Sequence, residues 1–382
     1  MSFLEACREE ISLYRYDKYL LFSVSMAVLV IFILSANIFG DGVVRDLPIG
    51  VVDRDNSSVS RNLIRHINAS ATLRVKNIFP STKEGVREMR NANIYALVVI
   101  PPNLEIDVKK GLSPTVSAFY NTQFVLVGRS ISSNLMQVLT TFNGKISVLK
   151  TLYLGDKKIS QAINESLPFN HQITPLFNLN FSYSKFLLVI IFPCIWQIFI
   201  VSTLILNFSA QRRKTSINLW LQRGAFGAFV AKLFIHQIFM FFWMLGFLAY
   251  FYGYLGWQMN GSFAYVVFAG YLTILASEAM ACLIYFTSFD SARSLSMAAA
   301  YTAPSLAFAG ITFPFSDMSP FAKFWNSLLP ISHYINIQIS QANYGLNISK
   351  TLPDILALLS LCLAFVVVLF VIRVLDLKKL GI

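Results

Sequence analysis

The chain has 382 residues, of which 55% are hydrophobic and 13% are charged, and its formal net charge at pH 7 is +12. Soluble domains carry about 25% charged residues, so this composition excludes an ordinary soluble globular protein. The basic residues concentrate in one polar region and in short loops. This distribution favours membrane topology and anionic lipid headgroups, rather than nucleic acid, as the reason for the positive charge.

The first residues predict a short amphipathic helix ahead of the first apolar segment. Its apolar positions follow a 3-4-3 spacing at Leu4, Cys7, Ile11 and Tyr14. A helix of this kind within residues 1–18 is expected to lie in the cytoplasmic membrane interface, with a solvated helical tail as the alternative. Several acidic residues precede the apolar segment at 19–39, which favours an uncleaved span over a signal peptide.

Six hydrophobic segments are each long enough to cross a hydrocarbon core about 30 Å thick. They lie at residues 19–39, 185–208, 227–255, 262–288, 294–315 and 353–373. Lys and Arg concentrate in the loop 209–226 and in the C-terminal tail, so both termini are expected in the cytoplasm. The sequence therefore predicts a polytopic α-helical membrane protein with six transmembrane helices, the last five of them within residues 185–382.

A polar region at residues 40–184 separates the first two spans and is predicted to lie outside the cytoplasm. Short apolar runs alternate in it with helical patterns, which is typical of a small α/β domain. The expected strands are residues 47–53, 72–78, 94–100 and 115–120, and the expected helices are residues 57–68, 81–90 and 103–110. A longer helical pattern at 123–153 predicts a stalk or a lateral helix. The region has no cysteine, so it must fold without disulfides.

Motifs for catalysis and metal binding are missing from the sequence. It contains no P-loop, HExxH, GxSxG or kinase signature, and no Cys/His cluster with metal-ligand spacing. Asp53, Asp55 and Asn56 resemble the start of a calcium loop, but the glycine and the closing glutamate of such a loop are absent. We expect a capped turn there, and neither catalytic residues, a metal nor a cofactor bound by this chain.

Glu278, His236 and Lys232 are ionisable residues that lie away from the ends of the expected spans, where unpaired burial is costly. Glu278 and His236 each lie about 14–15 Å from the inner ends of neighbouring spans, at the helical rise of 1.5 Å per residue. They are predicted either to form a structural interhelical pair or to line a transport path. Lys232, one turn from His236, either joins them or extends to the inner interface. Asp290 and Arg293 are expected to pair at a tight cytoplasmic turn.

The segment after the fifth span is rich in proline and aromatic residues. Residues 316–338 are too polar to cross a bilayer, yet too aromatic for a free loop. Amphipathic, re-entrant helices at the outer interface fit this pattern best. The residues that mark the segment are Gly310, Pro314, Pro320, Trp325 and Pro330.

Three passages together with the one-plus-five arrangement of spans resemble the membrane subunit of ABC-2 type transporters, the permeases of bacterial ABC exporters with a large periplasmic domain. The passages are residues 50–57 with Ser60, Arg61 and Leu63, residues 96–102 with Gly111, and residues 303–330. The resemblance covers nearly the whole chain. It does not discriminate between substrates.

The resemblance implies a half-transporter in the bacterial inner membrane that exports a hydrophobic or amphipathic substrate. Separate cytoplasmic ABC ATPases would use ATP and Mg, so the chain itself is not expected to be an enzyme. A second permease, identical or a sister subunit, would complete the conduit. A periplasmic adaptor and an outer-membrane channel are further partners of some members. The N-terminal helix and the basic loop would contact the ATPases, the latter through Arg212, Arg213, Lys214, Trp220 and Arg223.

Two other functions compete with export. A non-transporting membrane receptor or scaffold would use the outer domain to dock a protein partner. An ion-driven carrier is disfavoured because Glu278 is nearly alone as an intramembrane carboxylate. An ATPase gene beside the gene of this chain would favour export.

Overall fold

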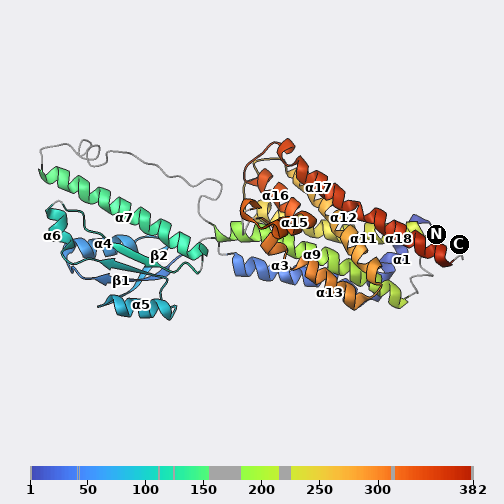
Figure 1. The fold of residues 1–382 in the computed structure, drawn as a ribbon, viewed down its shortest axis with the longest axis horizontal. Coiled ribbons are helices and arrows are strands. Elements are labelled where there is room, and N and C mark those ends of the chain that lie inside the picture. The colour runs from blue at the N-terminus through green and yellow to red at the C-terminus, as the bar shows by residue number, and fades with distance from the viewer. Residues whose placement is uncertain are drawn as a thin grey trace. The chain divides into compact units, whose positions relative to one another are not determined.

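The structure is a computed structural model that describes residues 2–40, 42, 44–110, 112–123, 125–154, 182–214, 225–310 and 315–379. The chain divides into two compact units (Figure 1). The polar unit is Asp41–Tyr183, and the helical unit combines Met1–Gly40 with Ser184–Ile382. The polar unit coincides closely with the polar region 40–184 of the sequence.

The polar unit contains a four-stranded sheet with the order β2-β1-β3-β4. Its strands are β1 (Leu47–Asp53), β2 (Leu73–Ile78), β3 (Ala96–Ile100) and β4 (Ser117–Tyr120). β1 pairs in parallel with β2 and β3, and β4 pairs antiparallel with β3. Each strand lies inside a range expected from the sequence, because short runs of β-branched residues between turn signals are a strong strand pattern.

Helices cover both faces of this sheet (Figure 1). They are α4 (Ser58–Asn68), α5 (Thr82–Arg90), α6 (Leu104–Lys109) and α7 (Val125–Leu154). Ile49 and Val51 of β1 lie in the larger core together with residues of α4 and α7. Val52 and Leu97 point to the opposite face and pack with Val86 of α5. This alternation follows from the period of two along a strand.

Helix α7 corresponds to the long helical pattern at 123–153. Ile131, Leu135 and Phe142 are buried in the larger core of the polar unit, so α7 is a packed layer of that unit along much of its length. Its residue Asn134 accepts a hydrogen bond from Ser70 at 3.5 Å, beside the end of α4.

The helical unit is built from helices throughout the part that the structure describes. Its N-terminal helices are α1 (Phe3–Tyr16), α2 (Lys18–Val24) and α3 (Met26–Phe39). The central ones are α9 (Tyr183–Lys214), α11 (Ala225–Leu248), the π-helix η1 (Ala249–Tyr254) and α12 (Phe263–Ser288). The remaining ones are α13 (Ser291–Thr302), α14 (Ser305–Phe308), η2 (Phe315–Asp317), α15 (Pro320–Leu328), α16 (Pro330–Ala342), η3 (Ile348–Lys350), α17 (Leu352–Cys362) and α18 (Ala364–Lys379).

Five helical stretches among the described residues are long and apolar enough to cross a membrane. They are Lys18–Phe39, Ser184–Lys214, Phe226–Tyr254, Phe263–Ser288 and Leu352–Val371. Each overlaps a predicted span, and together they make the chain a polytopic helical membrane protein. The second span continues to Lys214, six residues beyond the predicted end at 208, so the basic residues expected in the loop 209–226 begin on a helix.

The segment 294–315, predicted as a continuous fifth span, is divided in the structure. α13 ends at Thr302, and the short α14 begins after Pro304. Proline has no backbone N–H and its ring clashes with the preceding turn, which explains the interruption. Gly310 follows with a φ of +85°, a conformation that glycine adopts without strain. Hydropathy alone could not detect this break, because it averages over the whole segment.

The proline-rich segment forms two helices, each with a proline in its first turn. Pro320 begins α15 and Pro330 begins α16. Most residues of α16, on all sides of the helix, are buried in the helical unit. α15 has no buried residue and places Phe321 and Phe324 on its exposed surface. The position of the two helices at the outer membrane interface stays a prediction.

Candidate functional site

Helix α1 packs on the helical unit through a face that contains a charged residue. Its buried residues are Ala6, Cys7, Glu10, Leu13 and Tyr14. Of the predicted apolar positions, Cys7 and Tyr14 are buried, whereas Leu4 and Ile11 are 72% and 42% exposed, so the location of α1 in the membrane interface stays a prediction. The helix begins with a capping box in which Ser2 and Glu5 bond each other's backbone N–H groups. Hydrogen bonds from the backbone and hydroxyl of Ser2 lower the pKa of Glu5.

Glu10 of α1 lies in a first buried polar cluster with residues of α9 and α11. Lys232 donates to Glu10 Oε2 at 2.7 Å and to Asn207 Oδ1 at 2.8 Å. The Asn207 amide donates in turn to Glu10 Oε1 at 2.6 Å and to the Tyr14 hydroxyl at 2.9 Å. Both carboxylate oxygens of Glu10 are thus hydrogen-bonded, as a buried ion pair requires.

Lys232 was expected either to join Glu278 and His236 or to extend to the inner interface, and it does neither. Its side chain is fully buried, so it does not extend to the interface, and its carboxylate partner is Glu10 rather than Glu278. Glu10 lies one helical turn after Ala6 and Cys7 and one turn before Leu13 and Tyr14, so it shares their face of the helix. Glutamate in an amphipathic helix normally faces solvent, so sequence reasoning did not identify Glu10 as a buried residue.

A second buried cluster contains the pair expected from the sequence. His236 Nδ1 lies 2.7 Å from Glu278 Oε1, and both side chains are fully buried. The other carboxylate oxygen of Glu278 accepts from Gln237 Nε2 at 2.8 Å. His236 Nε2 lies 2.8 Å from the Thr203 hydroxyl, and Tyr271 donates to Gln237 at 3.2 Å.

The two clusters are neighbours on the same two helices. Thr203 and Asn207 are one turn apart on α9, and Lys232 and His236 are one turn apart on α11, so each helix contributes to both clusters. Together the clusters form a buried polar network that connects α1 with α9, α11 and, through Glu278, α12. Closely coupled polar groups of this kind fix the relative position of helices in an apolar environment.

The basic end of α9 holds α1 and α12 at the surface of the helical unit. Arg213 pairs with Asp17, the residue between α1 and α2, and Lys214 donates to the Ser12 hydroxyl of α1 at 3.2 Å. Burial raises the pKa of Asp17, but hydrogen bonds from Arg213 and from the backbone of Leu20 outweigh it and lower the pKa overall.

Arg212 contacts the other side, where it donates to the carbonyl of Phe289 at the end of α12. Phe289 has a φ of +50° and caps that helix. Asp290 and Arg293 do not form the expected side-chain pair within the described residues. Instead the carboxylate of Asp290 accepts the backbone N–H of Arg293 at 2.8 Å and caps α13. Trp220 and Arg223 lie outside the described residues.

Pro330, one of the residues that mark the segment after the fifth span, begins the helix that Gln197 of α9 contacts. Gln197 Oε1 accepts the backbone N–H of Ile331 at 2.8 Å, directly after Pro330, and its amide donates to Ser305 at 3.4 Å. Asn326 of α15 donates to the Phe308 carbonyl at 2.5 Å, close to the turn at Gly310.

Trp325, also on α15, is half-buried among apolar neighbours. Pro314 lies outside the described residues. Gln197, which sequence reasoning did not single out, thus joins α14 and α16 to the second span.

One protein family matches most of the chain. The family model of the ABC-2 family transporter protein matches residues 18–372, which include the entire polar unit and the helices α9, α11 and α12 of the polar clusters, but not α1. The chain belongs to the ABC-2 transporter family. Neither a curated protein nor a solved structure matches it.

Membership makes the chain a multi-pass membrane component of an ABC transporter and implies an ABC ATPase as its partner. Among the described residues no group of three or more His, Cys, Asp or Glu side chains is placed to hold a metal ion. The buried network contains acid and base groups, but each of its carboxylate oxygens is already hydrogen-bonded within the chain. The arrangement is therefore suited to holding helices together.

Proposed function

We propose that this chain is the permease half of an ABC exporter in a bacterial inner membrane, with six transmembrane helices and both termini in the cytoplasm. It would move a hydrophobic or amphipathic substrate outward, driven by separate ATPases that use ATP and Mg. The chain would bind no cofactor and would not be an enzyme. A second permease would complete the conduit. The polar unit would lie in the periplasm, where an adaptor linked to an outer-membrane channel is a further partner.

The observation that carries this proposal is the attachment of α1 to the spans. An interface helix that is only adsorbed to lipid would keep its charged residues at the surface. Here Glu10 is buried against Lys232 and Asn207, and Asp17 and Ser12 are bonded to the basic end of α9. A movement of α1 would therefore shift α9 and α11 directly. An ATPase that contacts α1 and residues 209–226 could drive the spans in this way.

We assign His236, Glu278 and Lys232 to this transmission rather than to the walls of a transport path. All three side chains are fully buried among helices of one protomer, and their polar atoms are bonded to one another or to neighbours. A path between two permeases would need groups on the protomer surface. The sequence left this choice open, and the burial favours the structural alternative.

The test is ATP-dependent export by the reconstituted complex of permease and ATPase. Replacing Arg213 and Lys214 with alanine is expected to lower export per hydrolysed ATP several-fold, while the complex still assembles and hydrolyses ATP. Lys18→Ala is the matched control, because Lys18 is an exposed cation next to Asp17. Normal export by the double variant would contradict the coupling role. Association of the purified chain with an envelope protein, but with no ATPase, would favour the receptor function instead.

A further inference from the structure

His333, in the first turn of α16, connects three helices of the helical unit. Its Nδ1 lies 2.9 Å from Asp354 Oδ1 of α17, and its Nε2 lies 3.2 Å from the backbone carbonyl oxygen of Ser327, in the last turn of α15. The other carboxylate oxygen of Asp354 accepts from Asn336 Nδ2 at 2.6 Å. The side chains of His333 and Asp354 are 12% and 16% exposed, so both exchange protons with the solvent. The coupling contacts described above do not use this group of residues.

Both partners of the His333 ring are hydrogen-bond acceptors. A carboxylate and a backbone carbonyl have no proton to donate. A neutral imidazole has one N–H and a lone pair on the other nitrogen, whereas the imidazolium has two N–H groups. Only the protonated ring can therefore donate to Asp354 and to Ser327 at the same time.

Two of the helix ends around the ring favour its positive charge. Asp354 lies in the first turn of α17, where a negative charge is stabilised, and Ser327 lies in the last turn of α15, where a positive charge is stabilised. The start of α16 itself opposes a positive charge on His333. The direct contacts with the carboxylate and the carbonyl outweigh this opposition, because hydrogen bonds to charged groups are stronger than the interaction with one helix end.

The other charged side chains on the helices that pack against α16 have different partners. Lys323 of α15 donates to the Ser316 carbonyl at 3.2 Å, and Glu278 of α12 belongs to the buried cluster with His236. α14 has no ionisable residue. Within the part of the chain that the structure describes, no tyrosine or cysteine of α12, α16 or α17 is bonded to the His333 ring or its carboxylate partner. Proton uptake or loss at this contact therefore concerns His333.

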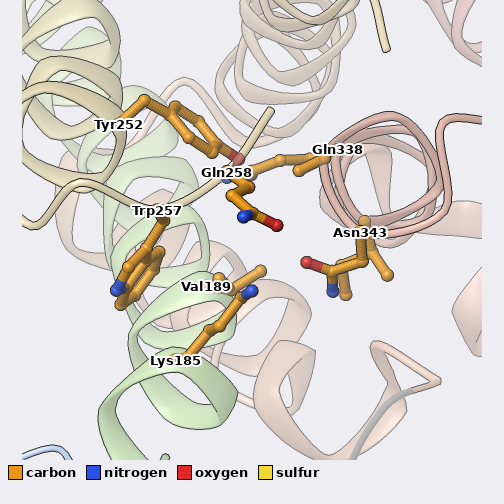
Figure 2. Close-up of a pocket in the computed structure, with 9 residues that line it drawn as sticks. Lys185, Val189, Tyr252, Trp257, Gln258, Gln338 and Asn343 are labelled. Carbon is orange, nitrogen blue, oxygen red and sulfur yellow. Dashed lines mark hydrogen bonds between the residues drawn. The ribbon is translucent and has the colours of Figure 1, made fainter. Parts of the chain in front are cut away.

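α16 is fixed to the helical unit by contacts that do not depend on His333. Gln338 donates to the Tyr252 hydroxyl of η1 at 3.3 Å (Figure 2), and Gln341 Oε1 accepts the backbone N–H of Ser262 at 3.1 Å. Most residues of α16 are also buried. A change at His333 therefore leaves α16 in place.

α15 is held less firmly than α16, because it has no buried residue. Among the described residues, hydrogen bonds at three backbone carbonyls attach its last turn. Asn326 donates to the Phe308 carbonyl, Tyr301 donates to the Leu328 carbonyl at 2.7 Å, and the histidine ring bonds the Ser327 carbonyl. Of these donor types, only histidine ordinarily changes its charge between about pH 5 and pH 8. The end of α15 is therefore the part that responds to pH.

We propose that His333, Asp354 and the Ser327 carbonyl form a pH-sensitive switch that holds the end of α15 in acid and releases it above neutral pH. When the ring gives up a proton to water, the remaining N–H stays on Nδ1, because a lone pair that faces a carboxylate is more unfavourable than one that faces a carbonyl. The lone pair on Nε2 then faces the Ser327 oxygen, and that hydrogen bond is lost. The switch goes beyond export, since it requires neither a substrate nor the ATPase.

Hydrogen exchange of the full-length permease in detergent, corrected for the intrinsic effect of pH, tests the switch. Protection of the amides at residues 324–329 should fall about three- to tenfold between pH 5 and pH 8, while protection of α16 stays constant. His333→Gln has no charge to lose, so its α15 should show low protection that does not change with pH. His66→Gln is the matched control, because His66 lies in the polar unit, and it should keep the native profile.

Asp354→Asn separates the switch from a simple loss of packing. The new amide can donate to the Nδ1 lone pair of the neutral ring, while its oxygen accepts from Asn336. The remaining N–H of the ring then stays on Nε2 and bonds Ser327 at every pH. This variant is therefore expected to keep α15 protected at pH 8, which is the opposite of the result expected for His333→Gln.

Each outcome decides for or against the switch. Constant protection of α15 in the native chain would overturn the proposal without any variant. A fall that persists in His333→Gln would assign the pH response to another group and overturn it as well, and so would loss of protection at pH 8 in Asp354→Asn. A native fall that the two variants abolish in opposite directions supports the switch. None of these results depends on whether the chain exports a substrate.

Discussion

Glu10 of α1 and Lys232 of α11 form an ion pair with an Oε2–Nζ distance of 2.7 Å, although they are 222 positions apart in the sequence. Asn207 completes the pair by accepting from the ammonium and donating to the second carboxylate oxygen. The attraction within a buried pair is largely offset by desolvation, but removal of one partner leaves an uncompensated buried charge. The position of α1 therefore depends on both residues being present.

Lys232→Met is expected to lower the free energy of unfolding by about 3–5 kcal/mol, because Glu10 is left as a buried charge. Adding Glu10→Gln should restore much of this loss, since the amide can still bond Asn207. Unfolding of the purified permease in detergent, followed by tryptophan fluorescence, provides the measurement. Glu9→Gln is the matched control, because Glu9 is the exposed neighbour of Glu10. A double variant no more stable than Lys232→Met alone would refute the pair as the cause.

The second cluster predicts a graded effect on stability. Glu278→Gln places an amide N–H₂ against either His236 or Gln237, both of which now bond its carboxylate, and should cost about 1–3 kcal/mol. Thr203→Val removes one hydroxyl that bonds His236 and should cost less, about 0.5–1.5 kcal/mol. Both costs are measurable by unfolding in detergent. In vesicles that carry the ATPase, the KM of export for the substrate should not change in either variant. A large rise in KM would instead place Glu278 on the transport path.

Sequence patterns in this chain predict local features, but not contacts between distant residues. The strand at 47–53 and the pair of His236 with Glu278 were predictable, because strand period, helical rise and the cost of burying charge in lipid are local or nearly local rules. The burial of Glu10 was not, because it depends on a lysine more than 200 positions away. The role of Gln197 was not predictable for the same reason, because its partners lie on α14 and α16.

Two glycines in helices of the polar unit predict opposite responses to the same substitution. A Cβ at Gly85 of α5 would lie 2.4 Å from Leu97 Cδ1, so Gly85→Ala should destabilise the unit by about 1–3 kcal/mol through overpacking. A Cβ at Gly144 of α7 meets nothing within 4 Å, so Gly144→Ala should stabilise it by about 0.5–1 kcal/mol through helix propensity. Differential scanning calorimetry of the full-length permease compares the two. Equal shifts in Tm would refute the close approach of α5 to β3.

Acid is expected to loosen the contact between α6 and the start of α4. Glu105 of α6 accepts the backbone N–H and the hydroxyl of Ser58, each at 3.2 Å, and pairs with Lys109 at 2.7 Å. The hydrogen bond from Lys109, followed by those from Ser58, holds the pKa of Glu105 below its usual value. A carboxyl with a lowered folded pKa contributes stability above its unfolded pKa of about 4.3, and this contribution is lost as the pH falls through the folded pKa.

Hydrogen exchange of the amides at residues 57–61 in the full-length permease, corrected for the intrinsic effect of pH, measures this loss. Protection in the native chain should be constant from pH 7 to about pH 5 and fall below about pH 4, as the carboxylate becomes protonated. In Glu105→Gln the protection should be lower at neutral pH and nearly independent of pH, because the amide is a weaker acceptor than a carboxylate. Asp107→Asn, on the same helix, is the control and should keep the native profile. An unchanged acid dependence in Glu105→Gln would show that another group holds the start of α4.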